Sequence, residues 1–219
     1  MTYIIADACV NFRSWFEASK MIDEVAATGC DCIKFQMWKE EHIAGHPRFE
    51  ELKKIILTEN EVRYLYWRTC GKIDLMITPF YPEAVGIINN YVKQWKIREK
   101  DNLNWGLIDK CLSTGKNVLI SMQDPKPRTY LIKQLYCIPE YPPKQGHDIL
   151  NNYKGFAGAS CHYPNIEVAL DFVRLGADFL EVHVMRDSYG DDAYEPIDCK
   201  VSLTMSELKE LVKRIREME

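Results

Sequence analysis

Short apolar runs alternate with amphipathic helical segments along the whole chain, and no other feature of the sequence restricts the fold as strongly. Three helical segments begin with a hydroxyl residue followed three positions later by a glutamate, the pattern of a capping box. Four helical segments end at a glycine, which tolerates the left-handed conformation that follows a helix. The pairs are Ser14 with Glu17, Thr58 with Glu61 and Thr204 with Glu207; the glycines are Gly29, Gly71, Gly115 and Gly176. This alternation indicates βαβ units and a parallel sheet.

Eight apolar runs have the length of strands, and eight strands favour a closed (β/α)8 barrel over an open doubly wound sheet. They cover residues 3–10, 32–37, 75–80, 94–99, 117–122, 134–138, 156–162 and 179–184. No glycine-rich phosphate loop follows any of them, which argues against a Rossmann or P-loop fold. We therefore expect one barrel domain over residues 1–219, with its polar site at the C-terminal ends of the strands.

The fifth βα unit is irregular. Only residues 123–133 separate the fifth and sixth runs, and this segment carries Pro125 and Pro127. A full helix hardly fits there, so we expect the fifth helix to be missing or reduced to a turn. Its loss helps to explain why 219 residues suffice for a barrel that typically takes roughly 250.

Charge and hydropathy exclude two classes of partner. The 28 Lys and Arg residues are scattered and the formal charge is −4, whereas nucleic-acid binding needs a basic face. No run approaches the ~20 apolar residues of a membrane-spanning helix, and the N-terminus lacks the basic region of a secretory signal. We expect no nucleic acid and no membrane among the partners.

The eight cysteines predict a reducing compartment rather than disulfides. Cys9, Cys32, Cys111 and Cys137 stand singly inside apolar runs, where a reduced cysteine behaves as a small hydrophobic residue. The one close pair, Cys30 with Cys32, lacks the CxxC spacing of a redox or zinc motif. We therefore expect a cytoplasmic protein.

Charged residues inside the strands carry the functional signal. Lys34 and Gln36 lie on one face of the second run, and Glu181 and His183 lie on one face of the eighth, because alternate residues of a strand point the same way. Lys96 in the fourth run and the pair Ser160 and His162 in the seventh repeat the pattern. Any one of them alone is as easily a satisfied strand end or a buried ion pair. Together on one rim they predict a metal between two imidazoles, beside lysines that bind an anion.

In order along the chain, these motifs resemble the barrel domain of the sialic acid synthases, including the legionaminic and pseudaminic acid synthases and the spore-coat polysaccharide proteins. The family's A-E-x-G-x-N-H corresponds to residues 6–12, K-F-Q to 34–36, T-P-F to 78–80, K-I-x-S to 96–99, C-x-x-x-Y-P to 137–142, G-x-S-D-H to 158–162, E-x-H to 181–183 and D-x-x-x-S-L to 198–203. The strand-five serine of the family corresponds to Ser121.

The resemblance implies condensation of phosphoenolpyruvate with the open-chain aldehyde of an N-acyl hexosamine or another aldose, giving a 2-keto sugar acid and phosphate. It places a divalent metal, Mn²⁺ with Mg²⁺ or Co²⁺ as alternatives, on His162 and His183. The remaining roles are implied in the same way. Asp7, Lys34, Glu181 and Asp198 are the expected catalytic residues, and Gln36, Thr78, Phe80, Lys96, Ser121, Tyr141 and Ser160 are the expected substrate-binding residues.

Several positions depart from the family pattern. Asp7 replaces a glutamate, Glu99 stands where a serine is usual, and a carboxylate there repels phosphate unless Arg98 offsets it. The other changes are Phe12 for histidine, Met122 after the strand-five serine, Pro139 for asparagine and Cys161 for aspartate. The family's C-terminal antifreeze-like domain has no counterpart in the 219 residues, so we expect a homodimer or a separate antifreeze-like partner chain to be the alternatives for assembly.

Three functions are compatible with this mixture of retained and changed motif residues. The first is a condensing enzyme with a different or smaller acceptor. The second is a metal-dependent aldolase or lyase acting on a phosphorylated or keto acid, and the third is a non-catalytic binding or scaffold module. The retained Lys34, Lys96, His162 and His183 favour the first.

Overall fold

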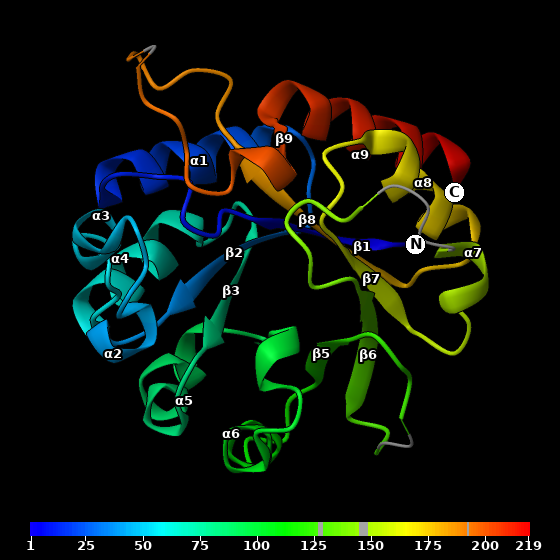
Figure 1. Cartoon of the computed structure of the whole chain (residues 1–219), viewed down its shortest axis with the longest axis horizontal. Coiled ribbons are helices and arrows are strands. Elements are labelled where there is room, and N and C mark those ends of the chain that lie inside the picture. The colour runs from blue at the N-terminus through cyan, green and yellow to red at the C-terminus, as the bar shows by residue number, and fades with distance from the viewer. Residues whose placement is uncertain (127–128, 145–148, 192) are drawn as a thin grey trace.

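The computed structural model, which describes residues 1–126, 129–144, 149–191 and 193–219, contains a nearly closed barrel of eight parallel strands (Figure 1). Around the barrel the hydrogen-bonded order is β3-β2-β1-β8-β7-β6-β5-β4, and β3 and β4 lie side by side at the remaining seam. The strands are β1 (Tyr3–Asp7), β2 (Cys32–Met37), β3 (Asp74–Pro79), β4 (Trp95–Ile97), β5 (Val118–Met122), β6 (Ile132–Cys137), β7 (Gly158–Cys161) and β8 (Phe179–Met185). The predicted (β/α)8 fold is confirmed.

The helices lie outside the strands and bury one apolar face against them (Figure 1). They are α1 (Trp15–Ala27), α2 (Glu40–Ile43), α3 (Phe49–Lys53), α4 (Glu59–Thr69), α5 (Pro82–Ile88), α6 (Trp105–Leu112), α7 (Ile149–Asn152), α8 (Ile166–Arg174) and α9 (Met205–Met218), with 3₁₀ turns at Asn89–Tyr91, Glu99–Asp101 and Cys199–Val201. None of the helices in the described ranges combines the length and apolar character needed to cross a membrane.

Local signals in the sequence set most helix boundaries. The four predicted glycines, at positions 29, 71, 115 and 176, all have φ between 74° and 88°, as a helix end requires. Thr58 with Glu61 and Thr204 with Glu207 form complete capping boxes. The first pair forms only half of one, because the Glu17 carboxylate accepts the backbone N–H of Arg13 (2.8 Å) rather than that of Ser14.

The predicted loss of the fifth helix is also confirmed. Between β5 and β6 the described residues contain no helix, and positions 127 and 128 lie outside the described ranges. The side chain of Gln134 occupies the outer side of β6, where it accepts from the backbone N–H of Lys126 (2.7 Å) and donates to its carbonyl (2.6 Å). A polar side chain on the outer face of β6 thus replaces the apolar contact that a helix would make.

Most strand ends lie within one or two residues of the predicted runs, and two differences are larger. β1 ends at Asp7 instead of residue 10, because the Asp7 carboxylate accepts the backbone N–H of Cys9 (2.9 Å) and turns the chain out of the sheet. A short strand β9 (Ser202–Thr204), which no apolar run announced, pairs with β8. Asn11, in the segment after β1, links β8 to β9: its side-chain amide donates to Val184 O of β8 (3.0 Å) and to Ser202 Oγ of β9 (2.8 Å).

The barrel interior is divided into an apolar layer and a charged layer. Toward the N-terminal ends, Ile5, Cys32, Met76, Leu119 and Leu135 fill the interior as one buried cluster. Two positions further along these strands the inward residues become polar, as Asp7, Lys34, Thr78, Ser121 and Cys137. The apolar layer closes the floor of the barrel, and the charged layer lies directly above it.

We expect Gly158→Ala to lower the free energy of unfolding by about 2–3 kcal/mol, because a Cβ on this β7 residue would lie 2.2 Å from the Phe179 carbonyl oxygen of β8. Urea unfolding followed by circular dichroism measures the change. Gly86→Ala is the matched control: no atom lies within 4 Å of its added Cβ, and alanine favours the α5 helix by up to about 1 kcal/mol. Equal stability of the two variants would contradict the tight β7–β8 contact.

Candidate active site

A cavity of about 750 Å³ opens at the C-terminal ends of the strands. It is lined by every residue to which the sequence assigned a role: Asp7, Lys34, Gln36, Thr78, Phe80, Lys96, Ser121, Tyr141, Ser160, His162, Glu181, His183 and Asp198. The strands bring these residues together because each contributes its last inward-facing side chains to the same rim. Their proximity is therefore observed, whereas their individual roles stay predictions.

Four buried charges of alternating sign form the floor of the cavity, and we call Asp7, Lys34, Lys96 and Glu181 the charge cluster. Lys34 Nζ lies 2.6 Å from Asp7 Oδ2 and 3.7 Å from Glu181 Oε2. Lys96 Nζ lies 3.4 Å from Glu181 Oε1, so Glu181 joins the two lysines. Two ammonium groups and two carboxylates balance, which makes the burial of four charges tolerable.

The environment tunes the two lysines in opposite directions. Burial alone lowers the pKa of Lys34, but the carboxylates of Asp7 and Glu181 outweigh it and hold the pKa above its ordinary value. Burial also lowers the pKa of Lys96, and there the attraction of Glu181 offsets only part of the effect. Lys34 is thus the more firmly charged of the two, and Lys96 gains most from a further anion.

Hydroxyl groups form hydrogen bonds with three members of the charge cluster. Lys34 Nζ donates to Thr78 Oγ1 (3.3 Å), Lys96 Nζ donates to Ser121 Oγ (2.7 Å), and Ser160 Oγ donates to Glu181 Oε1 (2.7 Å). Burial raises the pKa of Glu181, but both lysines and the Ser160 hydroxyl outweigh burial and lower it. Glu181 is therefore an ionised carboxylate at neutral pH.

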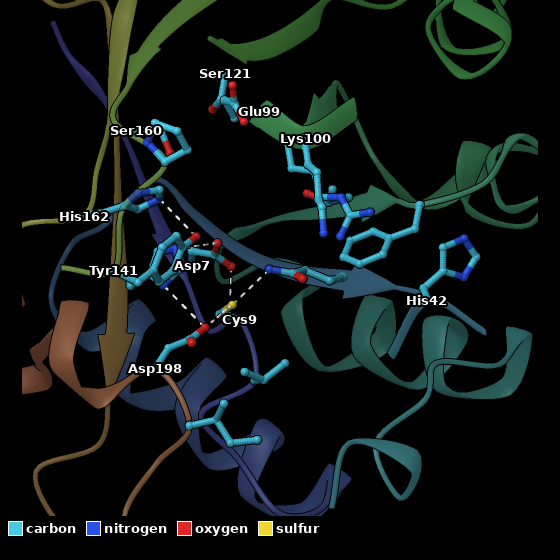
Figure 2. A pocket seen from close by; sticks show the side chains of 18 of the residues that line it. Asp7, Cys9, His42, Glu99, Lys100, Ser121, Tyr141, Ser160, His162 and Asp198 are labelled. Atoms are coloured by element: carbon cyan, nitrogen blue, oxygen red, sulfur yellow. Dashed lines mark hydrogen bonds and ion pairs between the residues drawn. The ribbon is translucent and has the colours of Figure 1, made fainter. Parts of the chain in front are cut away.

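Two imidazoles stand above the charge cluster with their ring centroids 5.1 Å apart. His162 Nδ1 lies 2.9 Å from Ile138 O, which fixes the proton on that nitrogen and leaves Nε2 facing the Tyr141 hydroxyl at 3.2 Å. Burial and the neighbouring His183 lower the pKa of His162 to about 3, so the ring is neutral, as a metal ligand must be. Tyr141 covers both rings from the mouth of the cavity (Figure 2).

Donor atoms suited to a divalent cation gather beside His183. Ligand atoms of Asp7, Cys9 and His183 all lie within 4.8 Å of one another, and Asp198 Oδ2 lies 3.8 Å from His183 Nδ1. That ring nitrogen is buried and has no hydrogen-bond partner among the described residues. Imidazole, carboxylate and thiol groups are metal ligands, so this side of the cavity fits a metal ion.

Cys9 is the site residue that the sequence did not assign. The cysteine was interpreted as a small hydrophobic residue of the first strand; it is buried, but it lies beyond β1 and its thiol lines the cavity. Its Sγ donates to Asp198 Oδ2 (2.7 Å) and accepts from Gln36 Nε2 (3.0 Å). Its place opposite the glycine of the A-E-x-G motif was the available signal.

The mouth of the cavity differs from what the motifs suggested. Arg98 does not offset Glu99: it forms an ion pair with Asp101 and its guanidinium lies 3.5 Å from the centroid of the Phe80 ring. Glu99 instead accepts a hydrogen bond from Gln123 (3.4 Å). Glu99 and Lys100 both line the cavity, as Figure 2 shows. His42 and His46, to which no role was assigned, line it as well.

The remaining departures from the family motifs fall into two groups, those in the apolar core and those that line the cavity. Phe12 is buried and packs against Trp15 and Phe35, with ring centroids 5.4 and 5.7 Å away. Like Met122 and Cys161, it belongs to the apolar core and is not among the residues that line the cavity. Pro139 does line it. The substitutions that bear on ligand binding are therefore Asp7, Cys9, Glu99 and Pro139.

Removing one member of the charge cluster leaves an unbalanced buried charge, so we expect Glu181→Gln to lower the free energy of unfolding by about 3–5 kcal/mol. Lys96→Met alone is also destabilising, but the double variant restores the charge balance and loses less than the sum, with a coupling of about 1–3 kcal/mol. Urea unfolding of the four proteins measures the cycle. Lys72→Met, which breaks the exposed pair with Asp23 (2.7 Å), is the control and changes stability by less than about 1 kcal/mol. Additive single effects would disprove the coupling.

Known proteins are similar to this chain in sequence and in fold. The chain is 26% identical to the N,N'-diacetyllegionaminic acid synthase of Campylobacter jejuni subsp. jejuni serotype O:2, over all of this chain and 76% of that protein. The alignment of 259 positions exceeds the 219 residues of the chain, so part of the aligned relative has no counterpart in this chain.

Solved structures agree with this likeness. The N-acetylneuraminic acid synthetase of Leptospira borgpetersenii serovar Hardjo-bovis superposes with a TM-score of 0.82 at 25% identity, covering 99% of this chain and 84% of that one. A spore coat polysaccharide biosynthesis protein of Bacillus subtilis shares the fold at 18% identity, with a TM-score of 0.73 over 99% of this chain and 67% of that one.

The family assignment rests on most of the chain. Residues 21–123 and 132–219 match the NeuB family, and the two matched segments contain β2 to β9 together with the cavity residues that those strands carry. The unmatched stretch 124–131 coincides with the connection from which the fifth helix is missing. The chain belongs to the NeuB family.

Proposed function

We propose that this protein condenses phosphoenolpyruvate with an aldose, such as an N-acyl hexosamine, in a reaction that also consumes one water molecule and forms a 2-keto sugar acid and phosphate. The observation that carries the proposal is the pair of buried lysines that Glu181 joins at the floor of a cavity whose wall holds two imidazoles. The synthase activities of the NeuB relatives support the same reaction class.

Phosphoenolpyruvate carries a carboxylate and a phosphate, and the cavity offers one ammonium group for each. Lys34 is held by Asp7 and Glu181, whereas Lys96 has one carboxylate partner at 3.4 Å. A bound phosphate next to Lys96 would reverse the lowering of that group's pKa by burial, so the interaction is strongest where the lysine is least satisfied. The hydroxyls of Thr78 and Ser121 accept from the lysines and so keep their protons for the same anion, whereas the Ser160 proton is donated to Glu181.

A divalent metal, which we propose to be Mn²⁺ bound near His162 and His183, would supply Lewis-acid polarisation of the acceptor aldehyde. The chain's own residues position the reactants around it. Asp7 Oδ2, 3.5 Å from His183 Nε2, orients that ring. Asp198, whose side chain is 18% exposed, is more accessible than Asp7 and can take the proton of the water that the condensation consumes, while Tyr141 packs against both imidazoles.

We expect release of phosphate from phosphoenolpyruvate to depend on both Mn²⁺ and an added aldose. A panel of N-acyl hexosamines and smaller aldoses, followed by phosphate release together with product mass, tests this. Lys96→Met and His183→Ala should each lower kcat/KM by about 100-fold or more, because each removes a group that contacts developing charge. Lys72→Met, far from the cavity, should retain full activity. A folded, metal-loaded protein that releases no phosphate with any aldose would reject condensation and favour other metal-dependent barrel chemistry.

Glu99 should weaken binding of the anionic substrate, since its carboxylate lines the cavity without a cationic partner among the described residues. We expect Glu99→Ser to lower the KM for phosphoenolpyruvate about fivefold with kcat little changed, which corresponds to about 1 kcal/mol between solvated charges. Initial-rate kinetics at fixed acceptor concentration measure both constants. Glu83→Ser, which removes a carboxylate outside the cavity, should leave KM unchanged. An increase in KM for Glu99→Ser would mean that Glu99 contacts the acceptor instead.

A further inference from the structure

Cys9 is placed in the cavity by a backbone conformation that cysteine rarely adopts. Its φ is 45°, and no other non-glycine residue in the described ranges has a positive φ. A left-handed conformation is unfavourable for a residue with a Cβ, because the Cβ crowds the following carbonyl oxygen, and such strain is concentrated at functional sites. Glycine, which the family motif has here, would adopt this conformation without cost. The thiol is therefore held in the cavity against a local preference of the backbone.

The groups around the thiol are those that orient a metal-bound sulfur. Gln36 Nε2 donates to Sγ (3.0 Å), a contact that stabilises a thiolate as well as a thiol. On the other side Sγ donates to Asp198 Oδ2 (2.7 Å), and Figure 2 marks the contact with a dashed line. The thiol is thus oriented between an amide donor and a carboxylate, in the wall that also contains His183.

His183 provides an independent observation. Its side chain is 3% exposed, and Nδ1 has no hydrogen-bond partner among the described residues. Nε2 lies 3.5 Å from Asp7 Oδ2 and Nδ1 lies 3.8 Å from Asp198 Oδ2, so a carboxylate oxygen stands beside each ring nitrogen and, in the neutral ring, one of the two nitrogens presents a lone pair to a carboxylate. A lone pair and a carboxylate oxygen repel each other unless a cation lies between them. Donor atoms bound to one metal ion are spaced by roughly 3–4.5 Å; the 3.8 Å between Nδ1 and Oδ2 lies in this range, and the 2.7 Å between Cys9 Sγ and Asp198 Oδ2 would widen once the thiol proton leaves.

We propose that Cys9 is a direct ligand of the metal ion, in a set formed by Cys9 Sγ, Asp198 Oδ2 and His183 Nδ1, with His162 on the adjacent side. On binding, the thiol proton that Asp198 now accepts in a hydrogen bond leaves to solvent, and both groups turn their lone pairs to the ion. Three ligands of different kinds on one face leave the opposite positions free for water or substrate.

A sulfur ligand changes which metal the site prefers. Thiolate favours Zn²⁺, Fe²⁺ and Co²⁺ over Mn²⁺ and Mg²⁺, which prefer carboxylate and water. We therefore expect this chain to bind Zn²⁺ and Co²⁺ more tightly than a site built on two imidazoles and oxygen ligands would. The inference shares its metal with the proposed condensation but concerns only the ligands, so it is tested without substrate.

The test is the absorption spectrum of the Co²⁺-loaded protein. We expect a near-ultraviolet thiolate-to-Co²⁺ charge-transfer band that saturates at one Co²⁺ per chain and is lost in Cys9→Gly and Cys9→Ser. Competition with a chromophoric chelator should show that Cys9→Gly weakens Zn²⁺ binding at least about tenfold and Mn²⁺ binding much less. Cys9→Gly also relieves the left-handed strain, so it should remain folded by circular dichroism.

Cys70→Ser and Cys199→Ser are the controls, because they remove the cysteines that are not buried, and both should keep the band. One bound Co²⁺ without a charge-transfer band in the unaltered protein, or a band that persists in Cys9→Gly, would overturn the proposal. The outcome is separable from that of the proposed function: a Cys9-dependent band without condensation would reject the condensation alone, whereas condensation without the band would reject the sulfur ligand alone.

Discussion

The balance of charge in the charge cluster, at the floor of the cavity, is the constraint on which the rest of the site depends. Glu181 on β8 lies within 4 Å of lysines from β2 and β4, and Asp7 on β1 holds the first of them. Four strands are thus tied together by charges that are each buried and none of which is tolerable alone. Under the proposed function the same lysines would also bind the substrate anion, and Lys96, with one carboxylate partner, is the less satisfied of the two.

Much of this arrangement could be predicted from the sequence, for reasons of periodicity. A strand repeats every second residue, so Lys34 with Gln36 and Glu181 with His183 had to face the same interior. The capping pairs mark where helices begin, and the glycines mark where they end and the next strand follows. These boundaries place the polar residues at the C-terminal ends of the strands, on one rim. The missing fifth helix followed from a short connection and its prolines, since residues 123–133 carry Pro125 and Pro127 and leave no room for a full helix.

Features that depend on contacts between distant segments could not be predicted in this way. The strand β9 exists because Asn11 bridges Val184 and Ser202, which lie more than 170 residues away from it in sequence. Arg98 turned to Asp101 and Phe80 rather than to Glu99, a choice among neighbouring partners that no pattern encodes. Cys9 looked like a core residue because its apolar neighbours extend the first strand, whereas the hydrogen bond from its own N–H to Asp7 ends that strand early.

Two departures from the family motif lie at the turn that ends β1, and they change the side-chain volume in opposite directions. Asp7 lacks one methylene relative to the glutamate of the motif, and Cys9 adds a side chain where the motif has glycine. The shorter carboxylate still reaches Lys34 at 2.6 Å while its other oxygen accepts the N–H of Cys9, so the thiol enters space on the side of Asp198 without breaking the charge cluster. A longer carboxylate on a tightly packed barrel wall would compete with the sulfur for that space. The two residues are therefore best understood as one change, which retains Lys34 in the charge cluster and alters the potential donor atoms in the cavity wall.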